Sequence, residues 1–186
     1  MAQKSIRCFV AVDLPTAMRD QIAAMQNEID VIGVKLVDPN LIHLTLKFLG
    51  DVPLNKVDVV EEALQKIEVP AFSAQVKGIG VFPGRSIRVI WIGALGQFAE
   101  LHQQVDDALS PLGFERDNRK FSAHATIARV KRPNSEINQI LASRLLPMKK
   151  VDLGDFLVDR FLLKKSTLTP QGPIYDDIAT FNLRFA

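Results

Sequence analysis

The sequence predicts an α+β fold built from a duplicated strand-helix-strand unit. Apolar runs of strand length alternate along the chain with amphipathic helical stripes, and this order occurs twice. A short motif of histidine and threonine recurs at the same point of each copy. The 186 residues are 47% hydrophobic and 24% charged, as in an ordinary globular protein. This length predicts a single domain over residues 1–186, with room for two lobes around a substantial core.

The first copy covers about residues 6–79. Its opening strand is apolar enough to lie inside a sheet, and the helix after it begins near Pro15 and ends at Gly33. In chain order we predict a strand (6–13), that helix, a short extended piece (34–37), the first motif strand (41–49), a helix (55–67) and a half-buried strand (71–79). A loop is predicted from Gly80 to Gly84.

The second copy covers about residues 87–160. Its predicted elements are a strand (87–94), a helix (98–112), the second motif strand (123–130), a helix (136–145) and a strand region (151–164). The two motif histidines are 124 − 43 = 81 positions apart, and the same offset places Val10 on Trp91. Internal duplication accounts for this repetition. A final strand is predicted at 173–186.

Each motif pairs a histidine with a threonine two residues later, His43 with Thr45 and His124 with Thr126. On a strand, two such side chains point to the same face. Only six of the 186 residues are threonine, so two such pairs among three histidines arise by chance in about three sequences per thousand. The third histidine, His102, has no such partner, and we predict it at the boundary or the surface of a helix.

Two imidazoles with two hydroxyls favour acid–base chemistry at phosphorus. One imidazole can accept a proton from an attacking water while the other donates a proton to the leaving oxygen. A histidine and a threonine about 6.5–7 Å apart on one strand face can bracket a tetrahedral phosphate. No metal site is expected, because no carboxylate or cysteine accompanies the histidines at ligand spacing. Threonine is also an uncommon nucleophile without a free N-terminal amine nearby.

Strict alternation gives an expectation for the rest of the first motif strand. Lys47 has the same parity as the motif residues, so it would lie beside them as an accessory group or as a solvated strand residue. The residues of opposite parity would lie in the core: Ile42, Leu44, Leu46 and Phe48.

Some residues near the motifs allow two interpretations. Strict alternation turns Arg129 away from the second motif, so it reaches a bound phosphate only if the strand twists, bulges or ends there; otherwise it is a solvated charge. Phe48, Phe121 and Tyr175 could stack on bases, or they could be core residues.

The charge distribution and the cysteine content limit which binding partners and which cellular compartment we expect. A net charge of +2 does not by itself indicate nucleic acid binding. Between Phe114 and Arg132, six basic residues stand against two acidic ones, which predicts either a positive cleft for phosphate-bearing ligands or a solvated loop. The single Cys8 excludes an internal disulfide and fits a reducing cytoplasm. Without a signal-peptide pattern or an apolar run of ~20 residues, we expect a cytoplasmic protein that does not enter membranes.

The two motifs resemble the paired H-x-T-x motifs of the 2H phosphoesterase superfamily. Its LigT-like branch comprises RNA 2′,3′-cyclic phosphodiesterases, which are also called 2′-5′ RNA ligases. Four segments resemble that branch in the same order: 7–15, 44–50, 124–129 and 166–175. The resemblance implies a bilobed fold in which antiparallel sheets line a central cleft that holds both motifs.

The resemblance also implies a reaction, the hydrolysis of RNA 2′,3′-cyclic phosphate ends to 2′-phosphomonoesters without a cofactor. In that reaction His43 donates a proton to the 3′ leaving oxygen, His124 accepts one from water, and Thr45 and Thr126 bind the phosphate, with Arg129 as a further candidate. The expected partners are RNA ends or nucleotides with a 2′,3′-cyclic phosphate, and we expect a monomer. Two alternatives stay open: 2′-5′ ligation of tRNA halves by the reverse chemistry, and a module that binds RNA ends or nucleotides without turnover.

Overall fold

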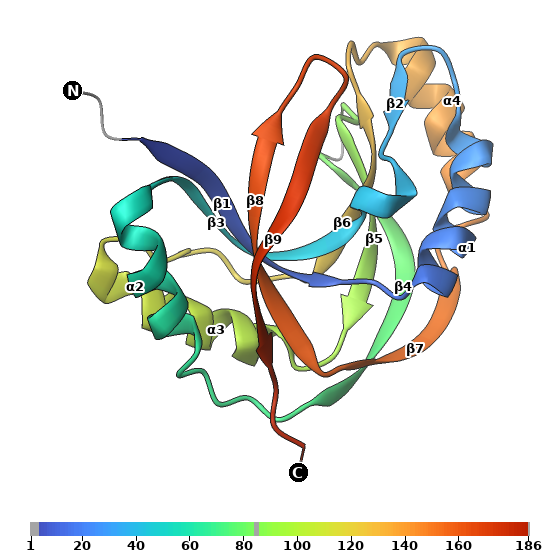
Figure 1. Ribbon diagram of the computed structural model, residues 1–186. Coiled ribbons are helices and arrows are strands. Elements are labelled where there is room, and N and C mark those ends of the chain that lie inside the picture. Colours follow the sequence, from blue (N-terminus) through green and yellow to red (C-terminus); the bar gives the residue numbers. More distant parts are fainter. Residues whose placement is uncertain (1–3, 84–85, 186) are drawn as a thin grey trace.

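The computed structural model describes residues 4–83 and 86–185. Within these ranges, nine strands form one curled antiparallel sheet and four α-helices pack against it (Figure 1). The predicted fold class, α+β with antiparallel strands, is confirmed. The strands are β1 (Ser5–Asp13), β2 (Val34–Leu36), β3 (His43–Pro53), β4 (Phe72–Phe82), β5 (Val89–Leu95), β6 (His124–Val130), β7 (Asp152–Val158), β8 (Arg160–Leu168) and β9 (Pro173–Asn182). The α-helices are α1 (Thr16–Gln26), α2 (Leu54–Leu64), α3 (Phe98–Leu109) and α4 (Ser135–Leu145).

The motif strands are neighbours at the centre of the sheet. The strand order is β7-β4-β5-β6-β3-β1-β8-β9, with β2 paired to β6. β3 and β6 meet at the pair Leu44 and Ala125, and a half-sheet extends from each of them. Each half-sheet contains strands from both predicted copies, because β4 pairs with β5 and β8 pairs with β1.

The helices are exchanged in the same way. Helix α3 contacts β3, and helix α1 contacts β6. Each motif strand is therefore covered by a helix from the other predicted copy. Figure 1 shows α2 beside α3 on one side of the molecule and α1 near α4 on the other. The two motifs are thus held by one interlocked framework.

Hydrophobic periodicity located the core correctly in most elements. All five side chains from Cys8 to Val12 in β1 are at most 3% exposed, as expected for a strand inside a sheet. The stripe residues Met18 and Ile22 of α1 are buried, and so are Phe98, Leu101, Val105 and Leu109 of α3.

A β-bulge interrupts each motif strand one residue after its threonine. In β3, Thr45 lies opposite Ala11 and Lys47 opposite Val10, which leaves Leu46 as an additional residue. In β6, Thr126 lies opposite Trp91 and Ala128 opposite Ile90, which leaves Ile127 as an additional residue. Because a bulge adds one residue to one strand, the side chains beyond it change faces.

The bulges overturn two expectations based on strict alternation. Lys47 does not share the face of the motif residues; its side chain is 7% exposed and pairs with Asp106 of α3. Phe48 is not a core residue, because it is 74% exposed. It lies opposite Phe9 in β1, on the face of the sheet that carries the motif residues, which we call the inner face. Arg129 occupies the equivalent place in β6, since 129 − 48 = 81, the same separation as between the motif histidines.

Candidate active site

The four motif residues lie together on one face of the sheet. Leu44 and Ala125 are paired across the strands and buried at 1% and 0% exposure. Continued by one residue in each direction, this antiparallel register places His43 opposite Thr126 and Thr45 opposite His124. All four side chains are half-buried. Each imidazole therefore has one threonine on its own strand and another across the junction.

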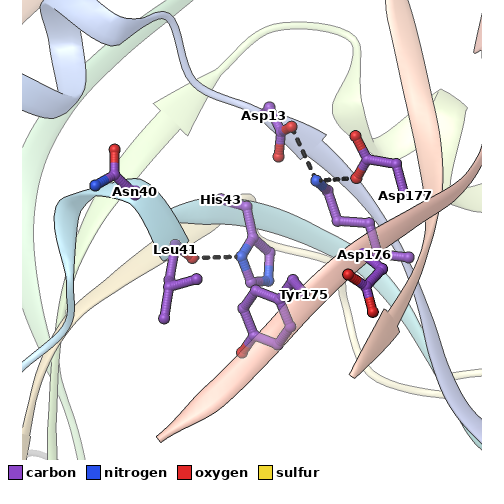
Figure 2. A pocket seen from close by; sticks show the side chains of 8 residues that line it. Asp13, Asn40, Leu41, His43, Tyr175, Asp176 and Asp177 are labelled. Carbon is purple, nitrogen blue, oxygen red and sulfur yellow. Dashed lines mark hydrogen bonds and ion pairs between the residues drawn. The ribbon is translucent and has the colours of Figure 1, made fainter. Parts of the chain in front are cut away.

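The ring nitrogens of the two histidines are arranged alike. Nδ1 of His43 lies 2.7 Å from the Leu41 carbonyl oxygen (Figure 2), and Nδ1 of His124 lies 2.8 Å from the Ser122 carbonyl oxygen. A carbonyl oxygen can only accept, so each Nδ1 carries a hydrogen and donates it. Nε2 of each ring is left as the nitrogen that can take up or release a proton.

Aromatic rings support both imidazoles. The ring centroid of His43 is 4.8 Å from Phe9 and 5.3 Å from Tyr175. That of His124 is 5.3 Å from Phe82 and 5.8 Å from Trp91. These contacts restrict the orientation of the imidazoles.

The Phe82 contact depends on a longer β4 than the sequence predicted. The predicted loop from Gly80 is wrong up to Phe82, because β4 continues to that residue; Gly84 lies outside the described residues. Gly80 also has a packing role in this strand. A Cβ at Gly80 would overlap the Trp91 ring, which lies flat against the β4 backbone there.

A cavity of about 420 Å³ opens beside His43. Lys164 of β8 is among its lining residues and donates hydrogen bonds to Asp13 at 3.0 Å and to Asp177 at 2.6 Å, which are drawn as dashed lines in Figure 2. Burial lowers the pKa of Lys164, but the bonds to Asp177 and Asp13 outweigh this effect and raise its pKa above the ordinary value. The ammonium group is thus fixed in its charged form. The lining residues are Asp13, Asn40, Leu41, His43, Lys164, Tyr175, Asp176 and Asp177.

The surroundings of His43 shift its protonation equilibrium. Burial lowers the pKa of His43 below the ordinary 6.5, while the bond to the Leu41 carbonyl and the charge of Asp13 act in the opposite direction. Burial also raises the pKa of Tyr175, and the positive charge of Arg129 opposes this shift. The field of Arg129 therefore reaches the tyrosine that touches His43, although the two residues belong to different half-sheets.

The other candidates from the sequence fall into two groups. Arg129 and Phe48 are exposed just beyond the two bulges, and Tyr175 lines the cavity beside His43. The ring centroids of Phe9 and Phe48 are 6.3 Å apart. Phe121 packs elsewhere, stacked on His102 at 4.2 Å.

The basic segment before β6 is partly neutralised. Arg116 pairs with Asp107, and Arg119 pairs with Asp117. The pair with Asp107 reduces the local positive charge that the composition predicted, whereas Asp117 is already one of the two acidic residues counted there. Within the described residues, no three His, Cys, Asp or Glu side chains come together as a potential metal-binding group.

One face of the sheet carries two threonine-flanked imidazoles whose Nδ1 atoms are both bound to backbone carbonyls, and the sequence comparisons identify the class of protein. The chain matches the LigT like Phosphoesterase family model over residues 12–91 and 93–175. The protein therefore belongs to the LigT-like phosphoesterase family.

Individual relatives cover nearly the whole chain. An RNA 2′,3′-cyclic phosphodiesterase of Archaeoglobus fulgidus is 39% identical over 95% of this chain and 99% of its own, and one of Methanocaldococcus jannaschii is 38% identical over 93% and 98%. A solved structure from Thermus thermophilus superposes with a TM-score of 0.80 at 28% identity, covering 97% of this chain and 99% of that one. In the part of the chain that is described, no helix is long and apolar enough to cross a membrane.

Proposed function

We propose that this protein hydrolyses the 2′,3′-cyclic phosphate at RNA ends to a 2′-phosphomonoester, with His43 and His124 as its acid and base. The observation that carries the proposal is the shared hydrogen-bond pattern of the two rings. Each Nδ1 is bound to the carbonyl two residues earlier, so Nε2 is the nitrogen of each ring that can exchange a proton, on the face that also carries the threonines. The relatives named RNA 2′,3′-cyclic phosphodiesterase support the same substrate.

The reaction needs two proton transfers, and the two imidazoles can supply both. Neutral His124 accepts a proton at Nε2 from the water that attacks phosphorus. As the new P–O bond forms, the bond between phosphorus and O3′ breaks, and protonated His43 donates its Nε2 proton to O3′. The phosphate stays on O2′. The next turnover requires His43 to regain a proton and His124 to lose one.

Charge builds on the non-bridging phosphate oxygens during this displacement. The hydroxyls of Thr45 and Thr126 flank the imidazoles and can donate hydrogen bonds to these oxygens. Arg129 reaches the same face because of the bulge at Ile127. Its guanidinium group can then donate to two phosphate oxygens at once.

The terminal base has a candidate contact at the other bulge. Phe48 offers a ring that is 74% exposed, and a base stacked on an aromatic ring gains about 1–3 kcal/mol. Because a ring accepts any base, this contact favours a nucleotide end without demanding one sequence.

The lowered pKa of His43 fits an acid that becomes protonated with the substrate. In the free protein its burial favours the neutral imidazole. A bound phosphodiester brings a negative charge next to the ring, and an opposite charge within ~4–6 Å favours the protonated form. The substrate itself would therefore help to charge the acid that expels its leaving group.

The test is the hydrolysis of a short RNA that ends in a 2′,3′-cyclic phosphate. His43→Ala and His124→Ala should each lower kcat/KM by about 10²–10⁴-fold, whereas Gln21→Met, a change at an exposed position of α1, should not. The product should be a 2′-phosphate, and EDTA should not alter the rate. Parent-like rates in both cleft variants would refute the proposal. Joined tRNA halves in place of hydrolysed ends would identify the protein as a ligase instead.

A further inference from the structure

The carbonyl of each bulge residue accepts a hydrogen bond from a side chain of a covering helix. Nδ1 of His102 in α3 lies 2.9 Å from the Leu46 oxygen, and Nε2 of Gln26 in α1 donates to the Ile127 oxygen at 2.7 Å. Both donors are buried, at 6% and 3% exposure. The additional residue of a bulge loses its regular place in the ladder, and a buried carbonyl without a partner is costly. The His102 bond therefore ties the Leu46 carbonyl to α3, and the Gln26 bond ties the Ile127 carbonyl, which also accepts from the Val37 amide, to α1.

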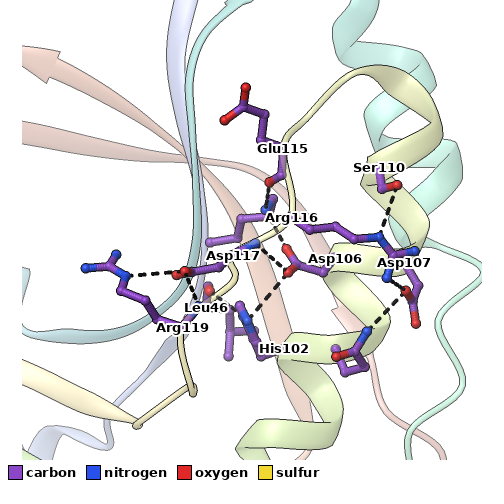
Figure 3. Close-up of polar contacts among 11 residues, drawn as sticks. Leu46, His102, Asp106, Asp107, Ser110, Glu115, Arg116, Asp117 and Arg119 are labelled. Carbon is purple, nitrogen blue, oxygen red and sulfur yellow. Dashed lines mark hydrogen bonds and ion pairs between the residues drawn. The ribbon is translucent and has the colours of Figure 1, made fainter.

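Each donor is itself held in one orientation. The second hydrogen of the Gln26 amide goes to the Val37 oxygen, also at 2.7 Å. The His102 ring is stacked on Phe121 with an interplanar angle of 13°, and its Nε2 lies 3.6 Å from Asp106. Because the Leu46 oxygen can only accept, Nδ1 of His102 carries the hydrogen (Figure 3).

The contacts of His102 overturn its predicted place at a boundary or surface. Asp106, one turn later in α3, accepts from Lys47 and from the Asp117 amide. The chain is therefore fixed at the Leu46 carbonyl and at the next side chain, Lys47. In β6 the residue after the bulge is the fully buried Ala128, and Ile127 oxygen also accepts from the Val37 amide at 2.9 Å.

We propose that Gln26 and His102 are positioning residues for the cleft. Gln26 holds the bulge that presents Arg129, and His102 holds the bulge that presents Phe48. This proposal rests on the proposed function, in which Arg129 binds the phosphate and Phe48 stacks on the terminal base. Each donor belongs to the predicted copy opposite to the strand that it binds. Because Gln26 positions Arg129 and His102 positions Phe48, loss of Gln26 should weaken the phosphate contact and loss of His102 the base contact.

The Gln26 half is tested with Gln26→Met, which keeps the side-chain length and removes both hydrogen bonds. In the parent, Arg129→Ala should lower kcat/KM by about 10²-fold. In the Gln26→Met background the same change should be at least about threefold less harmful, since residues that act through one another are not additive. Gln21→Met, at an exposed position of the same helix, is the matched control and should leave the effect of Arg129→Ala unchanged.

The His102 half is tested in the same way with His102→Leu and Phe48→Ala. His102→Leu should raise KM more than it lowers kcat, and it should reduce the additional loss caused by Phe48→Ala at least about threefold. His102→Asn should restore activity, because its amide nitrogen can donate from the place of Nδ1. The crossed pairs, Gln26→Met with Phe48→Ala and His102→Leu with Arg129→Ala, should be additive.

Additive effects within the two matched pairs would overturn the proposal. Thermal unfolding first verifies that each variant folds, and Gln26→Asn replaces Gln26→Met if the latter does not. If the parent hydrolyses no cyclic phosphate, the proposed function fails, and binding of inorganic phosphate then tests the positioning role separately. Gln26→Met should raise the Kd for phosphate at least about threefold, and an unchanged Kd would overturn the role of Gln26.

Discussion

Replacing Lys47 with Met would leave a buried carboxylate without its counter-charge. Lys47 and Asp106 are 7% and 3% exposed, and the Lys47 ammonium also donates to the Glu115 carbonyl at 2.7 Å. Met has nearly the length of Lys, so the change removes the charge without opening a large cavity. Asp106 keeps the hydrogen bond from the Asp117 amide at 3.0 Å but loses its ion pair.

The expected loss of stability is about 3–5 kcal/mol, the usual effect of removing one partner of a buried ion pair. For a chain of this size, 1 kcal/mol corresponds to about 2–4 °C in Tm, so the unfolding midpoint should fall by about 6–20 °C. Lys165→Met provides the matched control on the surface. Its partner Asp176 lies 3.7 Å away, and the two side chains are 39% and 58% exposed, so less than about 1 kcal/mol should be lost.

The assay is equilibrium unfolding in urea at pH 7, followed by circular dichroism. Both variants should keep the parent's m-value, because the surface exposed on unfolding does not change. If Lys47→Met is destabilised no more than Lys165→Met, the pair between β3 and α3 is not the fixed contact that its burial indicates, and the reasoning fails.

Four further predictions concern three separate sites. In a nuclear magnetic resonance titration, the His43 imidazole should titrate below pH 6.5 in the free protein and at a higher pH when 2′-AMP is bound; an unchanged value on binding would contradict the acid role proposed for it. Because this folded pKa is lowered, the unfolded chain binds more protons near pH 6, and this residue's contribution to stability should decrease as the pH falls through 6.5. Burial raises the pKa of Cys8 to about 11 from 9.0, so iodoacetamide at pH 8 should modify the folded protein at least about 100-fold more slowly than the denatured one, and equal rates would refute the burial. Gly80→Ala should displace Trp91 from His124 and lower kcat/KM about tenfold or more, and full activity would show that the indole contact is dispensable.

The sequence sufficed for the part of the site where the strands are regular. His43 and Thr45 share a face, as do His124 and Thr126, because ordinary alternation holds up to the threonine. The expectations failed directly afterwards, at Lys47 and Phe48. A bulge depends on how a strand aligns with its partners, and neither Leu46 nor Ile127 differs from a residue of a regular strand.

Contacts between segments that are distant in the sequence could not be predicted from the sequence pattern either. Lys164 and Asp13 are 151 positions apart, and nothing in their local sequence links them. His102 was expected at a boundary or the surface because it lacks the threonine partner of the two motif histidines. It is buried because Leu46 and Asp106 give both of its ring nitrogens a polar neighbour.

The pairing of β1 with β8 has a consequence for synthesis on the ribosome. β1 is synthesised well before the strand that covers its second edge, with pairs from Cys8–Lys165 to Ala11–Leu162. A nascent or prematurely terminated chain can therefore contain both histidine motifs and still present an open apolar strand edge, the kind of surface on which chains aggregate. Such a fragment would therefore be bound by chaperones or degraded by proteases before it could act as a catalyst.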